Sequence, residues 1–463
     1  MTTTKEPSDK PIIQFIAPCR INMDDPLSIL AGSGGVGLGD VRTSHEGRKA
    51  VLLVRDGDAR ELKALAETMK IEIVEIIHQP GTPDPQGYFG KGRLQDVADE
   101  LNTRIKGHLW EKVDLVIIHE NASPRQLVNI GNSLKTEVWD RVRLLLALFT
   151  SHASSVEART QVRIAQLQAD RTVLRELANQ QTSGERAGFG AGGSQALQSV
   201  LSTVSRELAS LRKRQKRHAL ARRERRRQRS RGGAKTVGLA GYTNAGKSSL
   251  FLTLSGKDVL IEDKLFSTLE TTVGRMELSP RILLADTIGF IDELPSDLLD
   301  AFHATLDESL QCDLLLLLAD SSDGNEELKR KLATSKREVL ERVDDSYINM
   351  IVVLTKSDKT TDTTAAIDVV EELGFSNPAI ISSHTGSGIE ELREEILSSL
   401  YGQEIQIEIT PGKEGERAQE SFISELYDLA IITKREENIF TIWCGEAELN
   451  RMISKSNGRI LLK

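Results

Sequence analysis

Short apolar runs alternate with amphipathic stretches through the first third of the chain. The expected strands are residues 50–55, 71–79 and 113–120, and the expected helices between them are residues 58–70 and 94–104. Ser123 suits a helix N-cap, and Pro124 suits the first helical position that follows. This alternation of strands and helices predicts a small α/β domain with a parallel sheet over residues 49–139.

The apolar pattern changes character in the next part of the chain. Residues 142–180 contain neither glycine nor proline and have apolar side chains at helical spacing, so one long helix is expected there. A glycine-rich stretch at 183–194 interrupts this pattern, and a second helical pattern covers residues 195–229. The two stretches predict an antiparallel helical hairpin within residues 140–231.

Two further domains are expected after the hairpin. Residues 235–401 alternate again between apolar strands and helices, which predicts a doubly wound, mostly parallel α/β domain. Residues 403–463 have the order β-α-β-β-α-β, which predicts a small ferredoxin-like α+β domain. Residues 1–48 carry little periodicity, so an N-terminal extension that is partly loop is expected there.

Charge is distributed unevenly along the chain. The 463 residues have a net charge of −8, yet about a dozen Lys and Arg lie between Arg212 and Arg231, against the single acid Glu224. A run of this density indicates a polyanionic partner. Aromatic residues are only 4% of the chain, which argues against a surface that stacks many bases.

The cysteines and the apolar content indicate the compartment. Cys19, Cys312 and Cys444 lie too far apart for a metal-ligand spacing or a disulfide framework. The polar N-terminus has no signal-peptide core, and the longest apolar run, 314–319, is too short for a membrane span. We therefore expect a soluble cytoplasmic protein.

Residues 241–248 read GYTNAGKS and fit the phosphate-binding pattern G-x-x-x-x-G-K-[ST]. Gly241 and Gly246 permit the tight turns of such a loop. Lys247 places a cation on the β- and γ-phosphates, and the Ser248 hydroxyl is a Mg²⁺ ligand. An expected strand precedes the loop and an expected helix follows it, as this motif requires.

A second motif, D-x-x-G, follows about forty residues later, at the end of another expected strand. Asp286 is suited to reach Mg²⁺ through water, and the Gly289 N–H can bond an oxygen of a γ-phosphate. Phe290 stands where many GTPases have a Gln that orients water. Because phenylalanine cannot do this, we expect slow intrinsic hydrolysis, and no residue is assigned as catalytic.

The third and fourth motifs select the base. Asp358, in T-K-x-D, can accept hydrogen bonds from N1–H and the N2 amine of guanine, which adenine does not offer. The backbone N–H of Ser383 or His384 is placed to bond guanine O6. Thr355 replaces the commoner Asn. All four motifs, in this order on strand ends, resemble those of a P-loop GTPase.

A threonine that binds Mg²⁺ is expected between the phosphate loop and the D-x-x-G motif. Thr268, Thr271 and Thr272 are the candidates, and spacing does not choose among them.

Longer strings of the chain resemble the HflX family of translational GTPases. The matching strings are DKLFSTLETT, DTIGFIDELPSDLLDAFHATLDES and CDLLLLLADSSD in the second half, and GYFGKGR, SPRQ, DRVRLLLALF and QVRIAQLQ in the first. The resemblance implies a ribosome-associated GTPase that acts on the large subunit, in a family whose members split stalled or idle ribosomes. It also selects Thr268 as the Mg²⁺-binding threonine.

The chain departs from the family in two places. The loop between the helices reads GFGAGGSQ at 188–195, without the usual Pro and Glu, and Glu270 replaces an Asp. GKGR at 90–93 can be read as a phosphate-binding loop, for a nucleotide or for rRNA, or as a plain loop leading into a helix.

The expected site residues form three groups. The expected guanine-nucleotide contacts are Gly241, Tyr242, Thr243, Asn244, Ala245, Gly246, Lys247, Ser248, Ser249, Phe266, Ser267, Thr268, Leu269, Glu270, Asp286, Thr287, Ile288, Gly289, Thr355, Lys356, Ser357, Asp358, Ser382, Ser383 and His384. The expected Mg²⁺ ligands are Ser248 and Thr268, with Asp286 acting through water. The expected RNA contacts are Arg222, Arg223, Arg225, Arg226, Arg227, Arg229 and Arg231.

The leading hypothesis is a monomeric GTPase that binds the large ribosomal subunit in the GTP state, splits or rescues ribosomes, and is stimulated by the ribosome to hydrolyse GTP. One alternative is a GTPase that acts on another RNA, in tRNA modification or ribosome maturation. Another is a nucleotide-gated binding module with negligible turnover, which Phe290 favours.

Overall fold

A computed structural model describes most of the chain. The described residues are 44–103, 107–153, 155–182, 191–231, 234–256, 272–277, 282–286, 290, 310, 312–341, 349–360, 362–410, 416–456 and 459–463. Most of the expected N-terminal extension and residues 188–190 of the glycine-rich loop lie outside these residues, and residues 191–195, expected as part of that loop, are helical instead. No helix of the described part is both long and apolar enough to cross a membrane.

The first sheet is parallel, as predicted, with the strand order β2-β1-β3-β4. Its strands are β1 (Lys49–Val54), β2 (Glu72–His78), β3 (Val113–Ile118) and β4 (Glu137–Trp139), and its helices are α1 (Arg60–Thr68), α2 (Lys91–Thr103) and α3 (Pro124–Leu134). The predicted cap of α3 is confirmed, because the Ser123 side chain accepts a hydrogen bond from the Gln126 N–H. The short strand β4 was not expected.

The single long helix expected over residues 142–180 is wrong. The structure has α4 (Arg141–His152) and α5 (Val156–Thr182), with extended backbone at Ala153. Ser155 lies before α5, and its hydroxyl accepts a hydrogen bond from the Ala158 N–H at 3.0 Å, which favours a new helix start there. Neither glycine nor proline marks the break, so the periodicity alone did not reveal it.

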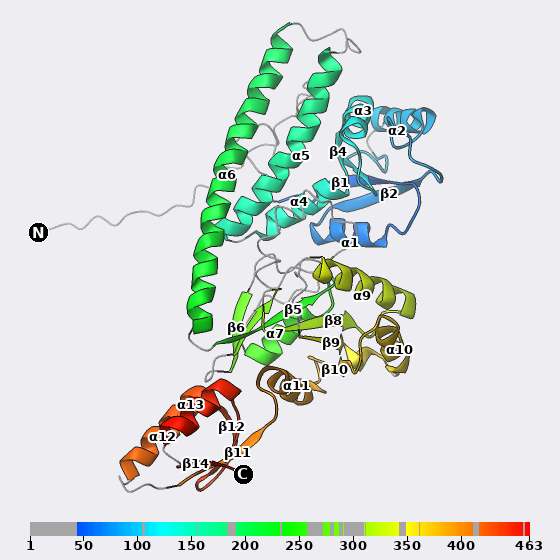
Figure 1. Cartoon of the computed structure of the whole chain (residues 1–463). Coiled ribbons are helices and arrows are strands. Elements are labelled where there is room, and N and C mark those ends of the chain that lie inside the picture. Colours follow the sequence, from blue (N-terminus) through cyan, green and yellow to red (C-terminus); the bar gives the residue numbers. More distant parts are fainter. Residues whose placement is uncertain are drawn as a thin grey trace, which may run out of the picture.

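Helix α5 and helix α6 (Ala191–Arg231) form the predicted hairpin and lie side by side in Figure 1. An ion pair between Arg163 and Glu207 and a contact of 3.0 Å between His218 Nδ1 and Glu157 Oε1 connect them. Helix α6 has 41 residues against 27 in α5. At a rise of about 1.5 Å per residue, it is therefore about 20 Å longer.

The second sheet has the order β10-β9-β8-β5-β7-β6, in which β6 alone is antiparallel to its neighbour. Its strands are β5 (Lys235–Gly241), β6 (Thr272–Glu277), β7 (Ile282–Asp286), β8 (Leu314–Asp320), β9 (Met350–Thr355) and β10 (Ala379–Ile380). The named helices beside them are α7 (Lys247–Ser255), α9 (Asn325–Leu340), α10 (Thr364–Glu372) and α11 (Ile389–Tyr401). The predicted α/β class is confirmed, and β6 is an additional strand.

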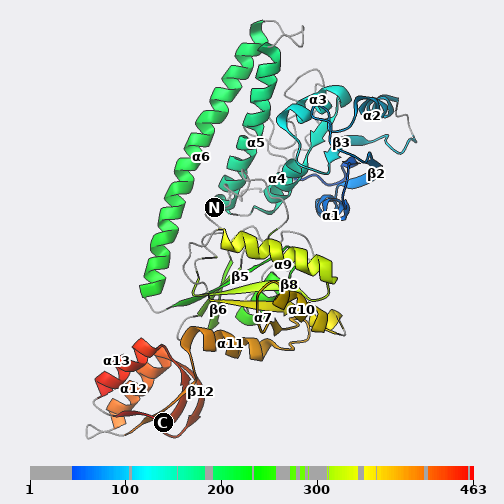
Figure 2. The same cartoon turned by 45° about the vertical axis from the view of Figure 1, so that its right-hand side comes forward.

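The third sheet has the antiparallel order β12-β13-β11-β14. Its elements are β11 (Ile405–Ile409), α12 (Glu416–Leu429), β12 (Ile431–Glu436), β13 (Ile439–Trp443), α13 (Glu446–Ser456) and β14 (Ile460–Leu462). This is the order of a ferredoxin-like sheet, as expected. Figures 1 and 2 both place it at the opposite end of the molecule from the tip of the hairpin.

The first and second sheets share a continuous apolar core. Leu65 of α1 and Leu145 of α4 belong to the same cluster of buried side chains as Tyr242 and Phe290. The two α/β units therefore meet beside the phosphate-binding motif.

Candidate nucleotide site

The turn after β5 requires glycine for a steric reason. Gly241 has φ +149°, and a Cβ there would lie 2.4 Å from the carbonyl oxygen of Leu318 on β8. Gly246, directly before α7, has φ +81° in the left-handed region. The close packing of β5 on β8 thus requires glycine at position 241, and the left-handed backbone before α7 favours it at position 246.

Lys247 lies under this turn and is almost fully buried, at 6% exposure. Its Nζ donates hydrogen bonds to the carbonyls of Gly241 at 3.1 Å and Tyr242 at 2.7 Å. Burial lowers the pKa of Lys247 to about 8; nearby Asp286 acts in the opposite direction, and Lys356 adds to the lowering. A bound phosphate would supply the negative charge that this buried cation lacks.

Ser248 and Asp286 meet across the site. The Ser248 hydroxyl donates to Asp286 Oδ2 at 3.0 Å, and Asp286, at the end of β7, is fully buried. A hydroxyl and a carboxylate are hard oxygen ligands of the kind Mg²⁺ prefers. No group of three or more His, Cys, Asp or Glu side chains in the described residues can hold a metal ion. The pair fits an ion that takes its remaining ligands from phosphates and water.

Phe290 pairs with the phosphate loop through its backbone. Its N–H donates to the Gly241 carbonyl at 3.0 Å, and its carbonyl accepts from the Thr243 N–H at 2.8 Å. The side chain is 2% exposed and belongs to the apolar core. The residue at the usual position of the water-orienting Gln is therefore a core residue.

Thr355 connects the two ends of the site. Its hydroxyl lies 3.0 Å from the carbonyl of Ala245, in the phosphate loop, and 3.1 Å from that of Ala319, on β8. One hydroxyl proton is shared between these two acceptors. Thr355 is 2% exposed and links β9 to the phosphate loop.

Asp358 is exposed, in a short 3₁₀ turn after β9. The hydroxyl of Ser382, which is fully buried, donates to Asp358 Oδ1 at 2.6 Å. This hydrogen bond lowers the pKa of Asp358. Ser382 was expected as a nucleotide contact, but its hydrogen bond to the carboxylate that is expected to select the base was not foreseen.

Lys356 has a partner that the motif did not reveal. Its Nζ lies 2.6 Å from Asp320 Oδ2, at the end of β8. Lys356 itself has φ +56°, which turns the chain from β9 into the segment that carries Asp358. The ion pair fixes the lysine beside the base end of the site.

Tyr242 lies where the phosphate loop meets its neighbours, at 5% exposure. Arg330 and Lys331 of α9 place their charged groups 5.5 and 5.6 Å from the centre of its ring. Glu61 and Arg141, an ion pair at 3.4 Å on the first α/β unit, lie close enough to influence its pKa, which burial raises. Sequence reasoning missed this contact because it joins residues remote in sequence.

Several expected residues lie outside the described part of the chain. They are Phe266, Ser267, Thr268, Leu269, Glu270, Thr287, Ile288 and Gly289, together with the alternative candidate Thr271. Thr272, the other alternative, begins β6 and is in register with Asp286 of β7.

The expected RNA contacts form a separate group. Arg222, Arg223, Arg225, Arg226, Arg227, Arg229 and Arg231 all lie on the C-terminal part of α6. Glu224, the acid among them, is exposed. The structure thus places the arginines on one continuous helix that ends next to β5.

A buried lysine under a glycine turn, a Ser–Asp pair and a carboxylate at the position expected to select the base, all at the strand ends of one α/β sheet, define a P-loop GTPase. Residues 236–356 match the family model described as 50S ribosome-binding GTPase, and residues 56–150 match the model described as GTP-binding GTPase N-terminal.

Relatives of known family identify the chain further. It is 33% identical over 402 residues to the GTPase HflX of Methanocaldococcus jannaschii, covering 85% of this chain and 94% of the relative. It is 30% identical over 385 residues to the GTPase HflX of Escherichia coli, covering 81% and 86%. The chain belongs to the HflX family of GTPases.

Among solved structures, the chain is similar to the crystal structure of the SsGBP and GDP complex. The identity is 27%, the match covers 75% of this chain and 97% of that one, and the TM-score is 0.46.

Proposed function

We propose that this GTPase binds the large ribosomal subunit in its GTP state and that the subunit stimulates hydrolysis. The observation that carries the proposal is the burial of Phe290, whose N–H and carbonyl are both bonded to the phosphate loop. A side chain held in this way does not orient an attacking water. Efficient hydrolysis therefore requires a group or an ordering contact from a partner.

The chemistry of α6 supports a nucleic-acid partner. Its C-terminal part carries seven arginines between Arg222 and Arg231, with the single acid Glu224 among them. Such a helix suits sequence-independent contacts with phosphates of folded rRNA. The alternative of a binding module with negligible turnover differs from this proposal because no partner would stimulate GTP hydrolysis.

The proposed site uses the four motifs in their expected roles. Lys247 holds the β- and γ-phosphates, Asp358 selects guanine, and the backbone of Ser383 or His384 bonds O6. Mg²⁺ would be held by Ser248 and Thr268, with Asp286 acting through water. The ion supplies charge neutralisation at the phosphates, while Phe266–Glu270 and Thr287–Gly289 respond to the γ-phosphate.

Three parts of the chain have a role in this proposal. Residues 49–139 and the hairpin 140–231 contact RNA, and residues 235–401 switch with the nucleotide, in a cytoplasmic, monomeric protein. Residues 1–48 and 403–463 are assigned no role. The outcome on ribosomes is the separation of subunits or the rescue of stalled ribosomes.

Co-sedimentation with purified ribosomal subunits tests the proposal. With a non-hydrolysable GTP analogue at low salt, the protein should migrate with the large subunit, and with GDP it should remain in the supernatant. The GTPase rate should rise by orders of magnitude on adding large subunits. Absence of co-migration, or an unchanged rate, would contradict the proposal.

Phe290→Gln provides a matched chemical test of the need for a partner. We expect the intrinsic rate to remain slow, because the backbone bonds to the loop persist, and the free energy of unfolding to fall by about 2–4 kcal/mol as an apolar core residue is lost. Phe290→Leu is the control for the change in volume. A large gain in intrinsic turnover in the Gln variant, but not in the Leu variant, would show that a polar side chain at position 290 is enough for hydrolysis and that no partner is needed.

A further inference from the structure

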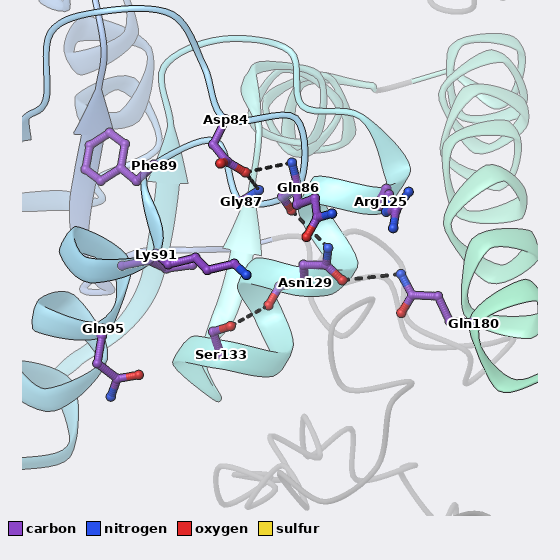
Figure 3. Close-up of a pocket in the computed structure, with 11 residues that line it drawn as sticks. Asp84, Gln86, Gly87, Phe89, Lys91, Gln95, Arg125, Asn129, Ser133 and Gln180 are labelled. Carbon is purple, nitrogen blue, oxygen red and sulfur yellow. Dashed lines mark hydrogen bonds between the residues drawn. The ribbon is translucent and has the colours of Figure 1, made fainter. Parts of the chain in front are cut away.

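A cavity of about 590 Å³ lies far from the nucleotide site, between α2, α3 and the end of α5. Figure 3 shows Lys91 extending from the start of α2 toward Asn129 of α3, with Arg125 and Gln180 across the space. Its volume falls within the roughly 300–1,000 Å³ of ligand pockets. Asp84, Gln86 and Gln95 also line it.

The loop at the mouth of the cavity is built in advance by hydrogen bonds. Asp84 Oδ1 accepts from the N–H groups of Gln86 and Gly87, both at 2.8 Å. The Gln126 side chain donates to the Asp84 carbonyl at 2.7 Å, and the Asn129 side chain donates to the Gln86 carbonyl at 3.0 Å. The loop is therefore fixed to α3, and the cavity does not have to form when a ligand arrives.

The two cations of the cavity are not used by the fold. Lys91 and Arg125 are both exposed, and neither has an ion-pair or hydrogen-bond partner among the described residues. Lys91 is the first residue of α2, whose first turn contains no acid, so the positive end of the helix dipole adds to its charge. The cations and the helix end therefore favour an anion in the cavity.

The rest of the lining suits a polar, planar group. The carboxamides of Gln86, Gln95, Asn129 and Gln180 line the cavity, and carboxamides can donate to and accept from the edge of a base. Gln180 donates to Asn129 Oδ1 at 3.3 Å, so α5 of the hairpin closes one side.

We propose that this cavity binds one nucleotide unit of a single-stranded RNA, with the phosphate at Lys91 and Arg125 and the base at the carboxamides. The proposal rests on the proposed ribosome function and deepens it, by naming an unpaired RNA nucleotide as a ligand of the N-terminal part. The net charge of the cavity favours a nucleotide within an RNA strand over a free nucleotide. Lys91 and Arg125 against Asp84 leave one net positive charge, which matches one phosphodiester rather than the three or four negative charges of a free triphosphate.

Fluorescence anisotropy with the full chain tests the proposal directly. The probes are a labelled single-stranded RNA of about 12 nucleotides and a duplex of the same sequence, at several salt concentrations. We expect Lys91→Ala combined with Arg125→Ala to weaken single-strand binding about tenfold and to lower its salt slope by about 1, with duplex binding unchanged. Lys112→Ala, an exposed lysine outside the cavity, is the matched control and should bind both probes as the unaltered chain does.

Competition experiments decide whether the cavity takes a nucleotide of an RNA strand or a free small ligand. AMP, which the guanine site should not take, and inorganic phosphate are added as competitors at millimolar concentration; no displacement supports an RNA nucleotide. Displacement that depends on Lys91 and Arg125 would overturn the proposal in favour of a free small ligand. An unchanged affinity in the double variant, or an equal loss on the duplex, would also overturn it.

This test distinguishes failure of the cavity proposal from failure of the proposed ribosome function. It uses isolated RNA, so it can succeed even if the unaltered protein fails to migrate with large subunits. If the protein does migrate with them and the double variant binds single strands normally, the cavity assignment alone fails.

Discussion

The two ends of the nucleotide site are built in opposite ways. At the phosphate end, Lys247 and Asp286 are buried at 6% and 0% exposure, and backbone carbonyls hold the lysine in place. At the base end, Asp358 is exposed and a hydroxyl from the buried Ser382 orients it. The phosphate end thus depends on buried charge, and the base end on one short hydrogen bond from the core to the surface. Changes at the phosphate end should therefore have the larger effects.

Lys247→Ala should have the largest effect. It removes the phosphate cation and leaves Asp286 buried without that charge beside it, so we expect GDP affinity to fall by at least about a hundredfold. Fluorescence of a labelled GDP measures this. Lys359→Ala, at an exposed lysine in the turn that carries Asp358, is the control and should change affinity little. Affinity within a few fold of the unaltered chain would contradict the role of Lys247.

Asp358→Asn should reverse the base preference at the exposed end. An amide in place of the carboxylate no longer accepts both guanine donors but can donate to the carbonyl that xanthine carries, so GTP affinity should fall by about a hundredfold while xanthosine triphosphate gains. Competition between the two triphosphates measures the change. Retained preference for GTP would mean that another group selects the base.

Ser382→Ala should have a smaller effect, because the carboxylate remains and only its orientation is lost. We expect guanine-nucleotide affinity to fall by about five- to tenfold, equally for GDP and GTP, since both carry the same base. Ser383→Ala is the matched control, because the contact proposed there is with a backbone N–H. Unequal losses for GDP and GTP would indicate that the serine acts on the phosphate end instead.

The smallest expected effect is a proton taken up on binding. With a pKa of about 8 before binding, Lys247 is charged below pH 8 and increasingly neutral above it, whereas a bound phosphate raises its pKa. GDP binding should therefore take up roughly three-quarters of a proton at about pH 8.5 and little at about pH 7, with affinity falling as pH rises through this range. Calorimetry in buffers of different ionisation enthalpy measures the uptake. Equal uptake at both pH values would mean that Lys247 is not the group that titrates.

The sequence was most informative where one short segment determines the chemistry. The strands around the phosphate loop are continuous apolar runs, and β8 is buried along almost its whole length, so periodicity and motif agree there. Asp286 and Asp358 could be assigned to strand ends for the same reason.

Contacts between distant segments were not predictable in this way. The hydrogen bond from Ser382 to Asp358, the link from Thr355 to Ala245 and the surroundings of Tyr242 each depend on how separate strands and helices meet. The break between α4 and α5 was missed because it depends on a serine cap rather than on glycine or proline. These features arise from packing and capping, which local hydrophobic pattern does not encode.

Helix α6 is also a mechanical element. It ends at Arg231, and only three residues separate it from β5, the strand that leads into the phosphate loop. At 41 residues it is about 60 Å long. A tilt of about 5° at the β5 end would move the opposite end by about 5 Å over that length. The geometry of a single helix thus relates angstrom-scale changes beside the nucleotide to displacements the size of a base at the far tip of the hairpin.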